Sequence, residues 1–342
     1  MLYELPNFDY LDATSIEQAL FWLQEYGNKA QVIAGGTDML GLIKDRIEDP
    51  RHPVPGILIN IKNIPDMNRL AYESDTGLDL GAAVRLHRLT EADAIKKYFP
   101  ILSRAAQQVG TTQIRYMGTI GGNIFQRPRC PYFRHPDFLC YKKGGPKCLA
   151  VAGEHRYYHS IVKHGICMMA HPSDMAPVFT ALNAEAVIEG QGGEKRVPFE
   201  DLFMISDHFT ETLLESNEIL KEIHVPPQKE GNYQLFLKHR IRHASDFSIV
   251  SLALMARVTN ETLEDIRMVL GGIAPLPYIA AEAQMLLKGE RLDKGLISKT
   301  ADKALERTHP LPNNEYKVDL AKALIKRALT FIWAKRAGAV SP

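Results

Sequence analysis

The sequence predicts an α+β protein in which two small α/β units precede an antiparallel sheet packed on helices. Three observations support this class. The chain has 342 residues, of which 45% are hydrophobic, enough for two or three domains with buried cores. Amphipathic helical patterns alternate with short apolar strand patterns up to residue 228. Longer strand patterns then follow Pro226 and Pro227 and lead into three helical stretches.

Residues 1–60 are expected to form the first α/β unit. Thr14 and Glu17 have the spacing of a capping box, an apolar stripe follows them, and Gly27 ends the predicted helix. A short strand, a glycine turn and the start of a helix are predicted next, and a second strand is predicted at "GILINIK".

Residues 61–228 are expected to form the second α/β unit. The strand pattern "GLDLGAAV" leads into a helix predicted from Thr90 to Val109, and strands recur at "EAVIEG" and "EILKEIHVP". A loop at 124–168 interrupts this unit and contains Cys130, Cys140 and Cys148, as well as Cys167.

Residues 229–342 are expected to form the antiparallel part. Three strands are predicted at "YQLFLKHRI", "FSIVSLALMARV" and "LEDIRMVLGGI". Helices are predicted at 278–288, 293–307 and 316–336.

The charge balance argues against two classes of partner. Lys and Arg total 41 and Asp and Glu total 40, so no global field attracts nucleic acid or an anionic membrane. No apolar run is long enough to cross a bilayer, and the first residues lack the pattern of an export signal. We therefore expect a cytoplasmic protein without membrane insertion, although a folded complex can be exported on a partner's signal.

Two glycine turns are candidates for binding a dinucleotide. Gly35 and Gly36 lie in "AGGTD", and Gly121 and Gly122 lie in "TIGGN". Neither has the G-x-G-x-x-G spacing, so a Rossmann site is disfavoured. Each turn alone is more often a plain strand–turn–helix junction. Together, one in each α/β unit, they could face each other across a cleft and let backbone N–H groups approach a pyrophosphate.

The four cysteines of the chain have the spacing C-x9-C-x7-C-x18-C. In a reducing compartment, clustered cysteines are more often metal-binding thiolates than disulfides. The spacing lacks the C-x-x-C pair of most structural zinc sites, which favours an iron–sulfur cluster but leaves zinc, or four unligated thiols, open. Basic residues that would offset the negative charge of a cluster lie nearby, at Arg127, Arg129, Arg134, Lys142, Lys143 and Lys147.

Other polar residues have a structural and a functional interpretation. Asp174 lies between Pro172 and Pro177, where a stiff backbone suits either a turn residue or a fixed ligand. Lys238 begins the basic stretch "KHRIRH", which is either a solvated strand face or a surface toward a phosphate or a reduced flavin. Five histidines near the cysteines lack a paired metal spacing, and most of them are expected to be polar surface groups or neighbours of ligands: His135, His155, His159, His164 and His171.

Four segments in order resemble one family: "VIAGGTDML", "QIRYMGTIGGN", "HPSDMAPVFTAL" and "FLKHRIRHASDFSIVSLAL". They resemble the FAD-binding subunit of the molybdenum hydroxylases related to xanthine dehydrogenase and carbon monoxide dehydrogenase. The cysteine segment resembles the branch with an additional [4Fe–4S] cluster, as in periplasmic aldehyde oxidoreductase and 4-hydroxybenzoyl-CoA reductase. The resemblance implies a two-part FAD-binding domain of the vanillyl-alcohol-oxidase (PCMH) type, followed by the family's C-terminal domain.

The resemblance also implies roles for individual residues. Asp174 matches an aspartate that contacts the flavin, Leu220 a residue beside the isoalloxazine, and Lys238 a basic residue near it. All four cysteines would bind the cluster, and no residue is assigned to catalysis. The pyrophosphate turn would consist of Val32, Ile33, Ala34, Gly35, Gly36, Thr37, Asp38 and Met39, and its counterpart of Thr119, Gly121, Gly122 and Asn123.

By the same resemblance, the chain is an electron-transfer subunit. A large subunit with molybdopterin would activate the substrate, and a small [2Fe–2S] subunit would relay electrons. FAD in this chain would exchange them with an external acceptor or donor, and oxidation of aldehydes or N-heterocycles is the expected reaction. The alternatives are the flavin subunit of an aryl-CoA reductase, or a non-redox regulatory module that binds FAD or zinc.

Overall fold

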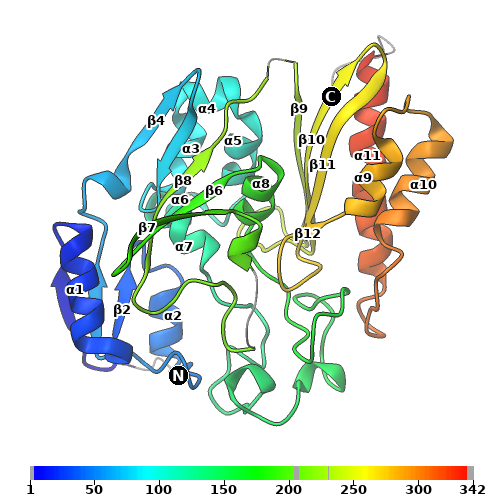
Figure 1. The fold of residues 1–342 in the computed structure, drawn as a ribbon. Coiled ribbons are helices and arrows are strands. Elements are labelled where there is room, and N and C mark those ends of the chain that lie inside the picture. Colours follow the sequence, from blue (N-terminus) through cyan, green and yellow to red (C-terminus); the bar gives the residue numbers. More distant parts are fainter. Residues whose placement is uncertain (1–3, 204–207, 230, 337–342) are drawn as a thin grey trace.

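The computed structural model describes residues 4–203, 208–229 and 231–336. Their strands form three sheets that follow one another along the chain (Figure 1). The predicted α+β class is confirmed. The predicted domain boundaries at 60/61 and 228/229 stay predictions. Residues 1–3 of the first predicted unit and 337–342 of the last lie outside the described residues. Among the helices described, none is long and apolar enough to cross a membrane.

The first sheet is parallel, with the strand order β1-β3-β2. The predicted helix after β1 is present, but the predicted capping box is wrong. Ser15 is the N-cap, and its hydroxyl accepts a hydrogen bond from the N–H of Gln18 at 3.2 Å, whereas Thr14 donates to the Gln18 side chain. The elements are β1 (Asp9–Asp12), α1 (Ile16–Tyr26), β2 (Ala30–Ile33), α2 (Met39–Lys44) and β3 (Ile57–Asn60).

The second sheet is antiparallel, with the strand order β4-β5-β8-β6-β7. The single helix predicted from Thr90 to Val109 is wrong. Ala92 has an extended backbone, and Pro100, which lacks an N–H, starts a new helix. The elements are β4 (Leu70–Glu73), β5 (Gly77–Gly81), α3 (Leu86–Glu91), α4 (Asp93–Tyr98), α5 (Pro100–Gln107), α6 (Thr112–Met117), α7 (Ile120–Ile124), α8 (Met175–Ala181), β6 (Glu185–Gly190), β7 (Gly193–Pro198) and β8 (Ile219–Val225).

The third sheet is antiparallel, with the strand order β12-β11-β10-β9, as predicted for this part of the chain. Helices α9 and α11 cover one face, and α5 and α8 contact the other (Figure 1). The stretch predicted as a helix from residue 278 begins with a short strand instead. The elements are β9 (Tyr233–His239), β10 (Val250–Thr259), β11 (Thr262–Gly271), β12 (Tyr278–Ile279), α9 (Ala281–Leu287), α10 (Lys294–Ala304) and α11 (Tyr316–Arg336).

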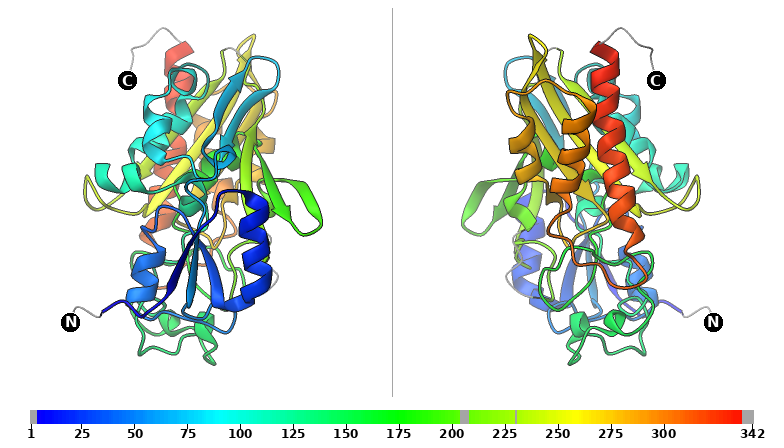
Figure 2. Two further views of the ribbon diagram at one scale, coloured as in Figure 1. Left: turned by 90° about the vertical axis from the view of Figure 1, so that its left-hand side faces the viewer. Right: turned by 90° about the vertical axis from the view of Figure 1, so that its right-hand side faces the viewer.

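The cysteine loop, residues 124–168, contains no α-helix or strand beyond the last residue of α7. It has two 3₁₀ helices, η3 (Tyr141–Lys143) and η4 (Leu149–Val151). Figure 2 shows the loop at the lower end of the molecule, below the first sheet. Loop residues Cys130, Phe133 and Cys140 form a small apolar cluster with Ile47, separate from the two large cores. The loop is therefore held largely by polar contacts.

Candidate functional site

A cleft of about 590 Å³ lies between the two glycine turns. Its volume falls within the range of small-molecule and cofactor sites. Leu220 on β8 and Arg127 of the cysteine loop also line it. Asn123, Asp174 and Lys238 are not among its lining residues. From the two predicted turns, the lining includes Val32, Ile33, Ala34, Gly35, Gly36, Thr37, Asp38, Met39, Thr119, Gly121 and Gly122.

The first turn presents backbone donors to this cleft. Within the described residues, no protein group accepts a hydrogen bond from the N–H groups of residues 35–39. Gly36 has a positive φ of 68°, which favours glycine. A Cβ on Gly35 would lie 2.2 Å from the carbonyl oxygen of Met117, so this glycine lets the two turns meet. A run of N–H groups in such a turn is an anion-binding arrangement.

The second turn is organised differently. The N–H groups of Ile120 and Gly121 donate to the carbonyls of Val84 and Ala82, at 2.9 and 2.8 Å. The Thr119 hydroxyl accepts from the N–H of Gly122 at 3.1 Å and caps α7. These backbone donors are therefore already used within the protein. The second turn forms a wall of the cleft, and the first turn has the donors for a pyrophosphate.

Asp38 joins the first turn to the cysteine loop. One carboxylate oxygen accepts from the backbone N–H of Arg127 at 2.8 Å, and the other pairs with Arg129 and Arg134, each at 2.8 Å. The carboxylate thus faces the loop, where it compensates two of the basic side chains that the sequence places near the cysteines. The position of the turn and that of the loop depend on each other.

Arg127 extends this connection to two further segments. Its guanidinium pairs with Asp49 at 2.9 Å and with Glu211 at 3.0 Å, and Glu211 also pairs with Lys142 at 2.7 Å. Burial opposes ionisation of both carboxyl groups. A hydrogen bond from His52 and the charge of Arg127 nevertheless lower the pKa of Asp49 to about 2. The charges of Arg127 and Lys142 likewise hold the pKa of Glu211 below its usual value.

Asp174 belongs to a buried polar network. Its carboxylate pairs with Lys238 at 2.6 Å and accepts a hydrogen bond from Ser248. The neighbouring Ser173 donates to the Asn123 side chain at 2.7 Å. The structure therefore brings Asp174 and Lys238 together, and connects them to the second turn through Asn123. Lys238 is on β9. The basic stretch "KHRIRH" that it begins is not a strand over its whole length, because β9 ends at His239.

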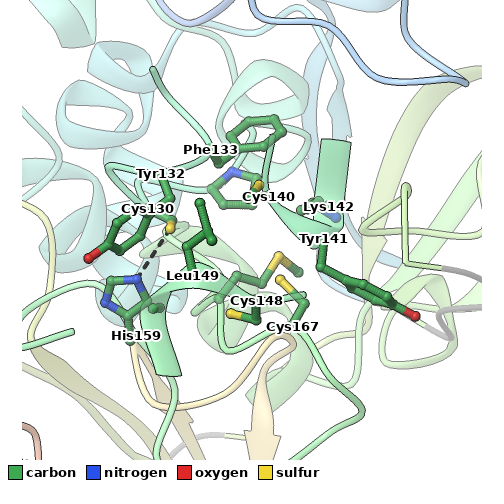
Figure 3. Close-up of a pocket in the computed structure, with 13 residues that line it drawn as sticks. Cys130, Tyr132, Phe133, Cys140, Tyr141, Lys142, Cys148, Leu149, His159 and Cys167 are labelled. Atoms are coloured by element: carbon green, nitrogen blue, oxygen red, sulfur yellow. Dashed lines mark hydrogen bonds between the residues drawn. The ribbon is translucent and has the colours of Figure 1, made fainter. Parts of the chain in front are cut away.

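All four cysteines line a second pocket (Figure 3). Phe133 lines both this pocket and the cleft, and is the one residue common to the two linings. The sulfurs are not gathered around one point. Cys148 and Cys167 lie next to each other (Figure 3), and no group of three His, Cys, Asp or Glu residues in the described chain is placed to hold a metal ion.

Backbone N–H groups near the sulfurs favour the thiolate form at all four cysteines. They lower the pKa of each thiol and so oppose the effect of burial. For three cysteines these groups include those two and three positions later in the chain. The residues are Tyr132 and Phe133 for Cys130, Lys142 and Lys143 for Cys140, Ala150, Val151 and Met168 for Cys148, and Met169 for Cys167.

The protonation of the free thiols follows their surroundings. Burial raises the pKa of Cys130 to about 12 and also raises that of Cys140. The hydrogen bond from Cys167 lowers the pKa of Cys148 and raises that of Cys167 itself. Four cysteine sulfurs line one pocket, and backbone N–H groups and two lysines lie near them. This arrangement suits a negatively charged group that has thiolate ligands.

The expectation for the histidines fits three of the five. His135 and His164 are exposed, and His159 Nε2 lies 3.2 Å from the Cys130 sulfur, next to a candidate ligand. His155 and His171 are buried instead. Sequence reasoning also missed Phe133, Asp49 and Glu211. The run "CPYFR" could have indicated an apolar residue beside a ligand. No sequence signal relates Asp49 and Glu211 to the loop, because those pairs join residues far apart in the chain.

Comparisons with known proteins agree with the fold. Residues 6–228 match the FAD binding domain in molybdopterin dehydrogenase, and residues 236–332 match the CO dehydrogenase flavoprotein C-terminal domain. The chain is 30% identical to the aldehyde oxidoreductase FAD-binding subunit of Escherichia coli, over 88% of this chain and 90% of that one. It is 26% identical to the glyceraldehyde dehydrogenase medium chain of Sulfolobus acidocaldarius, over 94% and 97% of the two chains.

A solved structure is also similar over nearly the whole chain. Carbon monoxide dehydrogenase from Hydrogenophaga pseudoflava has a chain that superposes with a TM-score of 0.77 at 26% identity, covering 97% of this chain and 99% of that one. The expected fold, an FAD-binding domain of the PCMH type with a further C-terminal domain, is thereby confirmed. The chain belongs to the family of FAD-binding subunits of molybdenum hydroxylases that includes those of xanthine dehydrogenase and carbon monoxide dehydrogenase.

Proposed function

We propose that this chain carries FAD and a [4Fe–4S] cluster and transfers electrons within a molybdenum hydroxylase. It would exchange them between the [2Fe–2S] clusters of a small subunit and an external acceptor or donor. The observation that carries this proposal is the shared wall of the two cavities, where Phe133 lines both the cleft and the cysteine pocket. Two redox groups in these cavities would lie next to each other.

In this proposal the first turn holds the FAD pyrophosphate. The N–H groups of residues 35–39 point to this role because no protein acceptor in the described chain uses them. Thr119 and the glycines after it form the opposite wall. Leu220 also lines the cleft, and in this proposal it would lie beside the isoalloxazine. The buried network that fixes the second turn contains the other predicted residues, Asn123, Asp174 and Lys238.

The four cysteines provide the thiolates for the cluster. The backbone donors at each sulfur stabilise the thiolate form, and Lys142 and Lys143, both buried, add positive charge. FAD supplies one- and two-electron chemistry when bound, and the cluster supplies one-electron chemistry. The protein's part is to hold the two groups close together and to shield them from water.

The partner subunits follow from the relatives. The Sulfolobus relative is named a medium chain, which implies larger and smaller chains beside it. We propose a molybdopterin-binding large subunit, where the substrate binds, and a small subunit with [2Fe–2S] clusters. Two relatives with aldehyde names, together with the cysteine segment, favour aldehydes as the substrate class over N-heterocycles.

Electron flow into the bound flavin tests this function. The complex purified from its native host should show bleaching of the flavin absorbance when an aldehyde is added without oxygen. The isolated chain, loaded with FAD, should show none. If the isolated chain oxidises an aldehyde as fast as the complex does, the electron-transfer role is wrong. If an N-heterocycle or a reduced aryl-CoA product reduces the flavin and aldehydes do not, the substrate class is wrong.

The rival function is a non-redox module in which the cysteines hold zinc. The wide cysteine spacing, without a C-x-x-C pair, argues against it. Metal analysis separates the two, because a zinc-loaded chain has no absorbance beyond that of the flavin, whereas a cluster adds a broad brown absorption.

A further inference from the structure

His159 is a buried residue that contacts a cysteine and has no role in the function above. The residue is 2% exposed, and its Nε2 lies 3.2 Å from the sulfur of Cys130 (Figure 3). Its other nitrogen, Nδ1, is buried and has no hydrogen-bond partner among the described residues. An imidazole that leaves one nitrogen unpaired is costly to bury, so its place against the sulfur calls for an explanation.

The backbone around His159 is fixed by the same residues that surround the last cysteine. His159 pairs with Met169 in an isolated antiparallel bridge, and the N–H of Ser160 donates to the Met168 carbonyl at 2.8 Å. Met168 and Met169 directly follow Cys167 in the chain. One pair of backbone segments therefore positions both the imidazole and the last cysteine.

A third anchor comes from the C-terminal part of the chain. Lys317 on α11 is fully buried, and its ammonium donates to the carbonyl of His159 at 2.9 Å and to that of Gly272 at 2.9 Å. The backbone of His159 is thus bound on both sides. A ring on so rigid a backbone keeps one orientation toward Cys130.

The chemistry of the contact determines which atom donates. A thiolate bound to iron carries no proton, so the shared hydrogen must lie on Nε2, and Nδ1 is then the bare nitrogen. A hydrogen bond to a ligating sulfur withdraws charge from it and favours the reduced, more negative cluster. We propose that His159 is a positioning residue that donates an Nε2–H hydrogen bond to the Cys130 thiolate and raises the reduction potential of the cluster. This inference rests on the proposed function.

The test is a redox titration of the holoprotein with three variants. His159→Leu removes the donor, and His159→Met is a second apolar variant should the first fold poorly. His159→Gln keeps an N–H donor. His155→Leu is the matched control, because His155 is also buried but its ring nitrogens interact with the Ala150 carbonyl and the Asn313 N–H rather than with a cysteine.

We expect the Leu and Met variants to keep their iron and FAD and to show a lower cluster potential. The Gln variant should lie nearer to the wild type, and the control should change stability without changing the potential. Histidine labelled with nitrogen-15 should give a weak hyperfine coupling in the reduced cluster, as expected for a hydrogen-bonded nitrogen.

Three results would overturn the inference, and they are distinguishable. An unchanged potential in an iron-loaded Leu or Met variant removes the proposed role of His159 and leaves the proposed function intact. Loss of iron together with a strong nitrogen coupling in the wild type makes His159 a ligand instead. A wild-type chain that holds no iron overturns the cluster and this inference with it.

Discussion

Gly35 is the position where one added methyl group should matter most. A Cβ there would lie 2.2 Å from the Met117 carbonyl oxygen, a distance that no side chain can tolerate without moving the backbone. Gly35→Ala should therefore push the two turns apart, lower the free energy of unfolding by roughly 1–3 kcal/mol and reduce bound FAD. The measurement is the FAD-to-protein ratio together with the melting temperature.

Gly41 provides the matched control for this variant. It lies in α2, directly after the first turn, and a Cβ there would meet nothing within 4 Å. Gly41→Ala should keep full FAD and gain up to roughly 1 kcal/mol, because alanine favours a helix over glycine. If the two variants hold equal FAD, close approach of the turns is not what shapes the cleft.

His171 should make the stability depend on pH. Burial lowers the pKa of its imidazole from 6.5 to about 4. The unfolded chain therefore binds this proton more tightly, so the contribution to stability is complete above pH 6.5 and is lost as the pH falls to about 4. The loss amounts to about 3 kcal/mol at most. Denaturant unfolding of His171→Phe should show a shallower slope over this window; a slope equal to the wild type would contradict the assignment.

At the scale of elements, the cysteine loop also forms part of the wall of the cleft. Arg127 joins it to Asp49 and Glu211, both buried. Arg127→Met would leave two buried carboxylates with less compensation, which costs roughly 3–5 kcal/mol for a broken buried pair. We expect a lower melting temperature and weaker FAD binding, measured by fluorescence titration of the apoprotein.

Arg156 is the control for that experiment. It belongs to the same loop, but its side chain is 51% exposed and pairs with Glu154 on the surface. Arg156→Met should leave both the FAD affinity and the melting temperature unchanged. Equal FAD affinity in the Arg127 and Arg156 variants would show that the loop and the cleft are independent.

The elements also show what a sequence can and cannot predict. Hydrophobic periodicity, together with residues that start or stop an element, was sufficient to predict α1, the strands β9, β10 and β11, and the long helix α11. The break at Ala92 and Pro100 was missed because the apolar period continues across it. The glycine turns were found from composition, but the unequal use of their N–H groups depends on partners such as Ala82 and Val84. Contacts between distant residues, such as Arg127 with Glu211, have no local signal.

At the scale of the whole molecule, the cleft and the cysteine pocket are adjacent. The cleft is lined by residues of the first sheet's unit and of the second sheet's unit. The loop that contains Cys130, Cys140, Cys148 and Cys167 lies at the lower end of the molecule (Figures 1 and 2). Replacing any one cysteine by serine should make the cluster labile, because a [4Fe–4S] cluster uses four thiolates. Iron and sulfide should fall in each of the four variants; a variant with an unaltered cluster and spectrum would show that its cysteine is not a ligand.

The central claim is that one chain holds both FAD and a [4Fe–4S] cluster. The most direct measurement is the iron, sulfide, zinc and FAD content of protein purified without oxygen, with paramagnetic resonance at low temperature after reduction. The account predicts one FAD, four iron and four sulfide per chain and a signal from one reduced cluster. A chain with FAD and zinc, or with FAD and four free thiols, would contradict it.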